Sequence, residues 1–199
     1  MEGQIIPIFD SFMPEAEVSI RVAKHLLGKD ALQSTVEIQV QKSQFTRKDT
    51  AKNDISFSMG TLMGELKLKQ ISSQPNLDGF RWLGEYELDN KKLIIHNKRL
   101  GICDVFANVG GKRVLIQCKG GFLNQTTTAK EYAAIWSVLG QVVATENVED
   151  GDIRAIAVPA SPAYRQVIAK IKDRPLIKQL GIKFILVSRN KDIEEIGSI

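Results

Sequence analysis

The sequence predicts an α/β fold in which a mixed central sheet is flanked by helices. The first observation behind this is Gly110-Gly111, which lies between two β-rich runs and predicts a hairpin over about residues 102–119. The second is the alternation of helical and strand patterns after the hairpin, which favours helices on the faces of a sheet. The expected elements are a helix at 129–146, a strand at Ile153–Val158, a helix at Ala163–Ile171 and a strand at Ile182–Val187.

A third observation is the helix–strand pair that precedes the hairpin. The first helix is expected from Pro14 to Leu27, because proline suits the first helical position and Gly28 suits the stop. Its apolar stripe is Val18, Val22, Ala23 and Leu26. Glu15 lies on this stripe, one turn before Val18. Glu17 is expected on the solvated face, beside Arg21 and Lys24.

The following segments divide into clear strands and a region that is harder to assign. Val36–Gln41 alternates with a period of two, which predicts a strand with one buried face. Residues 43–79 are polar, with a helix expected over Met59–Lys69, and fit either a small DNA-binding insertion or a solvated connection. Strand patterns return over Phe80–Ile95, with a break at Asp89-Asn90. We therefore expect one domain over residues 1–199, with an insertion at about 43–79 as an open alternative.

Composition limits the classes of function. The 199 residues carry a formal net charge of +4 and a pI of about 9.0, which fits a polyanionic partner such as nucleic acid. The N-terminus shows no signal peptide, and no apolar stretch reaches the ~20 residues that span a bilayer, so a cytoplasmic protein without a membrane partner is expected. Two cysteines, Cys103 and Cys118, encode neither a disulfide framework nor a zinc site.

The predicted hairpin brings three polar side chains together. If Gly110-Gly111 form the loop, the numbers of opposed residues sum to 221, so Asp104 lies opposite Gln117. Side chains alternate along a strand, which places Lys119 on the same face as Gln117. A buried carboxylate and a buried ammonium are costly unless they are paired or used in chemistry.

Phosphodiester cleavage would use these three groups. Asp104 can hold Mg²⁺, Gln117 can offer a neutral carbonyl oxygen, and Lys119 can position the attacking water or stabilise the phosphate charge. The alternative is a structural ion pair between Asp104 and Lys119, with Gln117 hydrogen-bonded nearby.

The text "GICDV" followed by "VLIQCKGG" resembles the PD-(D/E)xK nuclease superfamily in its Gln-x-Lys variant, as in Mrr-like restriction enzymes. The resemblance covers roughly residues 14–41 and 80–188 and implies a restriction-endonuclease-like core. It implies that Asp104, Gln117 and the backbone carbonyl of Cys118 bind Mg²⁺ or Mn²⁺, and that Lys119 is the catalytic lysine. The order helix, strand, hairpin, helix, strand matches that core.

Two further residues follow from this resemblance. Gln117 replaces the commoner acid, and a first-helix glutamate often compensates in such families, which makes Glu15 the candidate ligand and catalytic residue. In RecB-like members a glutamine on the helix after the lysine strand supports the active site, and Gln141 is similar in placement. A surface glutamine is the alternative reading of Gln141.

The helix after the hairpin has its own expected features. Thr128 with Glu131 three residues later predicts a capping box at its start. Tyr132, Trp136, Leu139 and Val143 lie at core spacing.

The function that these expectations favour is a Mg²⁺-dependent endonuclease that hydrolyses phosphodiester bonds in DNA, in restriction or defence. Cutting both strands of a duplex makes a C₂ homodimer plausible. The alternative is a DNA-binding or assembly module that keeps the nuclease fold without activity, favoured by the missing second carboxylate. A third reading is an unrelated α/β protein with a structural Asp–Lys pair.

Overall fold

The computed structural model describes residues 11–29, 35–40, 46–47, 55–56, 59–73, 82–96, 103–190 and 192–197. Its helices are α1 (Glu15–Lys29), α2 (Met59–Glu65), α3 (Ala129–Val143), α4 (Pro162–Ile171) and α5 (Pro175–Gln179). None of the helices in these ranges is both long enough and apolar enough to cross a bilayer.

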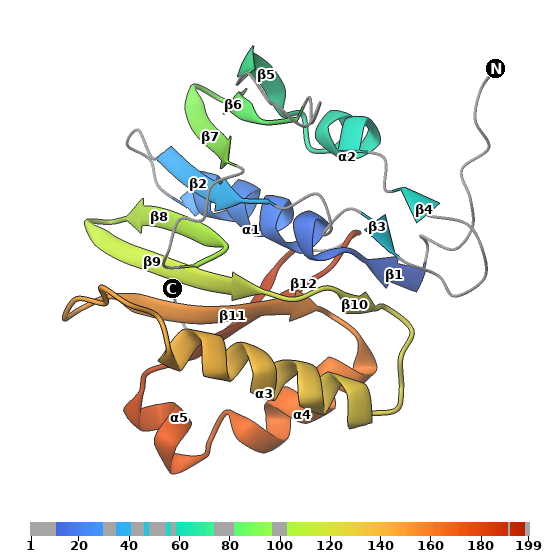
Figure 1. Ribbon diagram of the computed structural model, residues 1–199, viewed down its shortest axis with the longest axis vertical. Helices are drawn as coiled ribbons and strands as arrows, with labels where there is room; N and C mark the ends of the chain where they lie inside the picture. Colours follow the sequence, from blue (N-terminus) through green and yellow to red (C-terminus); the bar gives the residue numbers. More distant parts are fainter. Residues whose placement is uncertain are drawn as a thin grey trace.

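A nine-stranded mixed sheet runs through the molecule (Figure 1), in the order β13-β12-β11-β9-β8-β2-β7-β6-β5. Its strands are β2 (Thr35–Gln39), β5 (Lys69–Ser73), β6 (Gly84–Leu88), β7 (Lys91–His96), β8 (Val105–Val109), β9 (Lys112–Cys118), β11 (Ile153–Pro159), β12 (Lys183–Val187) and β13 (Glu194–Ile196). β9, β11 and β12 are parallel, as are β2 and β7, and the other neighbours are antiparallel. The expected mixed central sheet is therefore confirmed.

Two short ribbons complete the described strands. β1 (Phe12–Met13) pairs with β10 (Gly121–Phe122), and β3 (Thr46–Arg47) pairs with β4 (Ile55–Ser56). In β1–β10, the rings of Phe12 and Phe122 lie edge to face, with centroids 5.1 Å apart. This ribbon fixes the start of α1 beside the segment that follows β9 (Figure 1).

Helices cover both faces of the sheet. The apolar side of α1, which includes the predicted Val18, Val22, Ala23 and Leu26, is fully buried against one face. α3, α4 and α5 cover the other face over β9, β11 and β12 (Figure 1). The core order α1, β2, β8–β9 hairpin, α3, β11 is the order expected from the sequence.

The two hairpins form at the expected turns. Val109 pairs with Lys112 and Val105 with Ile116, which confirms the predicted register of the β8–β9 hairpin. Gly110 and Gly111 both have positive φ, of 56° and 78°, which glycine adopts without strain. The break expected at Asp89-Asn90 is the turn between β6 and β7, where both residues have positive φ.

Residues 43–79 contain one described helix. The helix predicted over Met59–Lys69 ends at Glu65, and Lys69 begins β5, the last strand of the sheet. Lys67 adopts a positive φ of 58° between them, which terminates the helix. Much of the remaining segment lies outside the described residues.

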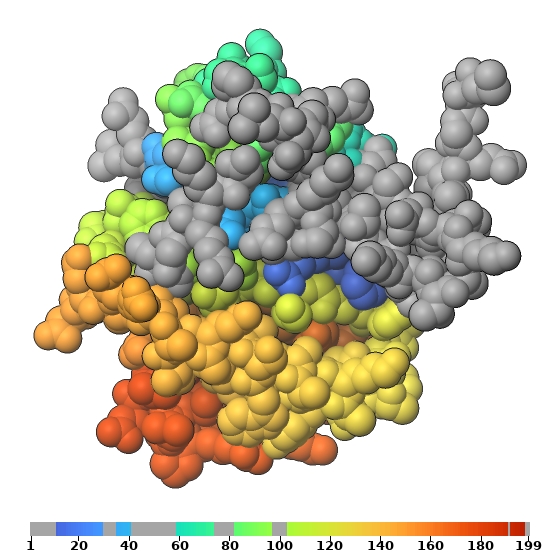
Figure 2. All heavy atoms as spheres, viewed as in Figure 1, coloured from blue at the N-terminus to red at the C-terminus, as the bar shows by residue number. Residues whose placement is uncertain are grey.

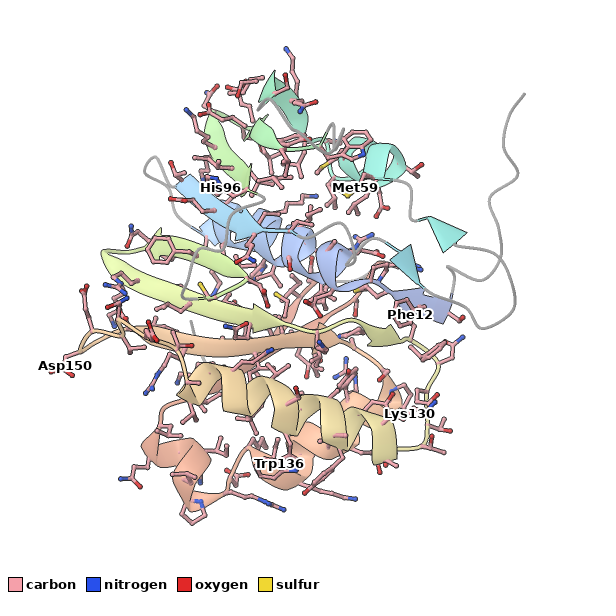
Figure 3. The ribbon with its side chains drawn as sticks, viewed as in Figure 1. Phe12, Met59, His96, Lys130, Trp136 and Asp150 are labelled. Atoms are coloured by element: carbon pink, nitrogen blue, oxygen red, sulfur yellow. The ribbon has the colours of Figure 1, made fainter. Side chains whose placement is uncertain are left out.

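Two of the core positions expected on α3 are wrong. Trp136 and Val143 are 42% and 60% exposed, because α3 buries Ile135, Val138 and Val142 beside the expected Leu139. Trp136 lies on the side of α3 away from the sheet (Figure 3), where its ring contacts Tyr132 and Arg174. In the space-filling view α3 forms part of the face turned to the reader (Figure 2).

Candidate active site

The start of α1 and the end of β9 meet through the β1–β10 ribbon. Met13 pairs with Gly121, which places Glu15 beside the residues that follow Lys119. Gly120 lies directly against this helix start, since an added Cβ would be 2.7 Å from both the Glu15 nitrogen and the Met13 oxygen. A glycine at position 120 therefore permits the close approach of the two segments.

Glu15 and Lys119 form an ion pair across this junction. Lys119 Nζ lies 3.1 Å from Glu15 Oε2, with the two side chains 38% and 19% exposed. Both groups are thus reachable from solvent but partly screened from it. The structure brings together the first-helix glutamate and the hairpin lysine that the sequence singled out.

Asp104 is the third member of the site. Its carboxylate Oδ2 accepts a hydrogen bond of 2.7 Å from the backbone N–H of Cys118. Burial raises the pKa of Asp104 from its usual 3.8 to about 6; the Cys118 hydrogen bond lowers it, the charge of Glu15 raises it and the charge of Lys119 lowers it. Asp104 therefore lies within electrostatic reach of both Glu15 and Lys119.

The described pairing of β8 with β9 ends one residue before Asp104 and Gln117, which the sequence predicts to lie opposite each other. The last paired residues are Val105 and Ile116, and the Asp104 N–H donates to the Ile116 oxygen at 3.0 Å. The Asp104 oxygen in turn accepts from the Gln39 N–H on β2. Asp104 leaves the hairpin ladder at this point, which lets its carboxylate reach the Cys118 backbone.

Gln117 and Cys118 lie on opposite faces of β9. The Cys118 side chain is 1% exposed and belongs to the apolar cluster on the α1 side, so only its backbone can serve the site. Burial raises the pKa of its thiol well above the usual value. Gln117 is half-buried and points to the other face, the one that α3 covers. The contacts described for Asp104 involve Cys118, Glu15 and Lys119.

The structure does not bring Gln141 to this junction. Gln141 is exposed and lies in the last turn of α3, where its backbone oxygen accepts from the Thr145 hydroxyl. The end of α3 nearest β10 is its first turn, where Lys130 is labelled (Figure 3). The surface-residue reading of Gln141 fits this placement.

Glu131 and Tyr164 are two residues near the junction that sequence reasoning did not assign to it. Thr128 makes no side-chain cap bond, so the predicted capping box is wrong, and Glu131 is instead 4% exposed. Its Oε2 has no hydrogen-bond partner within the described parts of the chain. Tyr164 on α4 donates its hydroxyl to the Gly120 oxygen at 3.2 Å, and burial together with the charges of Glu131 and Glu15 raises its pKa. In the sequence, the spacing of Thr128 and Glu131 matches a capping box, so the burial of Glu131 was not predicted.

The donor set suits an oxygen-ligated ion. Glu15 and Asp104 are like-charged carboxylates close enough to influence each other, and a divalent cation would offset both their repulsion and the burial of Asp104. Where the chain is described, no cluster of three or more His, Cys, Asp or Glu side chains is arranged to hold a metal. Carboxylate oxygens are the ligands that a hard ion such as Mg²⁺ prefers, so the two acids fit such an ion.

Comparisons with models of protein families, with curated proteins and with solved structures found no match to this chain.

Proposed function

We propose that this protein is a metal-dependent endonuclease that hydrolyses phosphodiester bonds in DNA, with Glu15, Asp104 and Lys119 as its reacting groups. The observation that carries the proposal is the Lys119–Glu15 pair at 3.1 Å, within electrostatic reach of the partly buried Asp104. Two acids and one lysine at a solvent-accessible junction provide an ion site and a cation for phosphate. The core order α1, β2, β8–β9, α3, β11 supports a restriction-endonuclease-like fold.

Each residue has a defined part in this scheme. Asp104 and Glu15, with the backbone carbonyl of Cys118, would hold Mg²⁺ or Mn²⁺, and the Cys118 N–H fixes the orientation of Asp104. When bound, the ion lowers the pKa of a coordinated water and neutralises phosphate charge. Lys119 donates hydrogen bonds to a non-bridging phosphate oxygen and stabilises the charge that develops there.

The role of Gln117 changes in this proposal. Glu15 supplies the second carboxylate from α1, which the hairpin itself lacks. Gln117, which strand parity places on the same face as Lys119, then adds a neutral oxygen to two carboxylate ligands. The substitution of glutamine for an acid on the hairpin is compatible with a two-carboxylate site.

The choice of DNA as substrate and of a dimer as the assembly are also proposals. The net charge of +4 favours a polyanion. A single site on each chain makes two copies the simplest way to cut both strands of a duplex.

A nicking assay on supercoiled plasmid tests the function. We expect cleavage with Mg²⁺ or Mn²⁺, none in EDTA, and a loss of about 10²–10³-fold in rate for Asp104→Ala and Lys119→Ala. Glu146→Gln, at an exposed acid beyond α3, is the matched control and should cleave like wild type. Cleavage by folded Lys119→Ala at the wild-type rate would contradict the assignment.

A second candidate is a nuclease-fold module that binds DNA without cutting it. Gln117 in place of an acid and the neutralisation of Lys119 by Glu15 favour it. DNA binding by wild type without nicking under any of the metal conditions would select this candidate.

A further inference from the structure

The Glu15 carboxylate has two competing partners, Lys119 and the proposed divalent ion. In the structure its Oε2 lies 3.1 Å from Lys119 Nζ, so it neutralises the lysine. In the proposed function, on which this inference rests, the same carboxylate helps to hold a divalent ion beside Asp104. If the carboxylate binds an ammonium and a divalent ion at the same time, both contacts are weakened, because the two cations repel one another.

The surroundings of the pair favour an exchange of partners over a fixed contact. Lys119 is 38% exposed and follows the last residue of β9, so its side chain has room to turn toward solvent. Glu15 is anchored through its backbone at the start of α1, where Gly120 and the β1–β10 ribbon hold it. The mobile partner is therefore the lysine.

Asp104 supplies the attraction that drives the exchange. Its carboxylate is fixed by the Cys118 N–H and feels the negative charge of Glu15. A divalent ion placed between the two acids relieves that repulsion and expels the positive charge of Lys119. The released ammonium, which is partly exposed to solvent, can then contact a phosphate group.

We infer that the Lys119–Glu15 pair orders the loading of the site, with the cation binding first and the phosphate second. Without the ion, Glu15 holds Lys119 and weakens its contact with phosphate. With the ion, Glu15 binds the metal from the same position, and Lys119 turns away from it to the DNA backbone. Cation binding and DNA binding are thereby coupled through one carboxylate.

A double-mutant cycle on DNA binding tests this coupling without requiring cleavage. The binding of a fluorescein-labelled duplex is measured by anisotropy, in EDTA and in Ca²⁺, for wild type, Glu15→Gln, Lys119→Ala and the double variant. In EDTA, Glu15→Gln should bind about tenfold more tightly than wild type, the size of an ordinary coupling. Ca²⁺ should tighten wild type by a similar factor and leave Glu15→Gln almost unchanged.

The double variant separates released lysine from a simple change of charge. The gain from Glu15→Gln should vanish in the Lys119→Ala background and persist in the Lys119→Arg background, which keeps the positive charge. Glu146→Gln removes an exposed acid elsewhere and should change affinity less than twofold. Circular dichroism of each variant establishes that it is folded before it enters the cycle.

Two results would overturn the inference: no gain for Glu15→Gln in EDTA, or a gain that survives in Lys119→Ala. Wild-type nicking of plasmid with Mg²⁺ is measured on the same preparation. Nicking without coupling would remove the ordered loading and leave the nuclease, whereas coupling without nicking would remove the nuclease and leave the exchange.

Discussion

At the scale of single residues, Asp104 is an acid whose pKa is raised by its surroundings. Its pKa of about 6 arises mainly from burial, and the charge of Glu15 adds to it. Burial and the nearby charge of Glu15 disfavour the charged form of this carboxylate, and a bound cation would stabilise it. A raised pKa of this kind marks Asp104 as a candidate functional residue.

The pKa of Asp104 predicts how the metal-free protein responds to pH. The unfolded chain releases this proton near pH 3.8 and the folded chain near pH 6, so the folded state binds more protons between these values. The contribution of Asp104 to stability therefore falls as pH rises from about 4 to 6, by up to about 3 kcal/mol for a shift of roughly two units. Asp104→Asn, which keeps an oxygen for the Cys118 N–H, should gain stability over wild type across this window.

Urea unfolding in EDTA at pH 4 and pH 7 measures this difference. Wild type and Asp104→Asn should lie closer in stability at pH 4, with the variant more stable at pH 7. An unchanged gap between the two proteins at the two pH values would show that Asp104 titrates normally.

Residue-level reasoning from sequence identified Asp104, Lys119 and Glu15, and the structure brings these three together. The hairpin register is as predicted down to Val105 and Ile116, where the described pairing ends, and the opposition of Asp104 and Gln117 stays a prediction. The same reasoning was wrong about Glu17, which it placed on the solvated face. Glu17 is 1% exposed, and one of its partners, Arg189, is 172 residues away, which no local pattern reveals.

At the scale of elements, a buried ionic network holds α1 in place. Glu17 binds Arg21 at 2.9 Å and Arg189 at 2.7 Å, and Arg21 also binds Glu65 on α2 at 3.0 Å. Arg189 also donates a hydrogen bond of 2.7 Å to the backbone oxygen of Phe12 on β1. The network joins the helix that carries Glu15 to α2, to β1 and to the segment after β12.

Removal of the central acid should destabilise the fold strongly. Glu17→Ala leaves Arg21, which is 7% exposed, and Arg189 without their shared counterion, at a cost of about 3–5 kcal/mol. Glu65→Ala is the matched control, because Glu65 also pairs with Arg21 but is 50% exposed, and it should cost about 1 kcal/mol or less. Urea unfolding of both variants gives the comparison, and equal losses would show that burial of Glu17 is not what matters.

The elements were predicted correctly where a short sequence pattern is compatible with a single structure. The positive φ required at Gly110-Gly111 set the hairpin register, and the apolar period of α1 set its buried side. Prediction failed on α3, where apolar residues occur on more than one side. Trp136 and Val143 matched the helical period, but the packing of α3 on the sheet and α4 selected Ile135 and Val142.

At the scale of the whole molecule, the sheet places the proposed site at one end of its central strands. β9 lies between β8 and β11, and its last residue leads directly to Lys119. α1 covers one face and α3 the other, so residues from both sides of the sheet approach the same junction (Figure 1). The alternation of elements predicted this core, whereas the extension through β7, β6 and β5 depends on a parallel β2–β7 contact that the sequence does not reveal.

The central claim is that Asp104 and Glu15 form a divalent-ion site, and calorimetric titration of Mn²⁺ tests it most directly. We expect wild type to bind Mn²⁺ at pH 7, Asp104→Ala to lose that binding, and Lys119→Ala to bind more tightly, because it frees Glu15 and removes a repelling charge. Glu146→Gln should titrate like wild type. An isotherm for Asp104→Ala identical to that of wild type, or the absence of Mn²⁺ binding by wild type, would contradict the account.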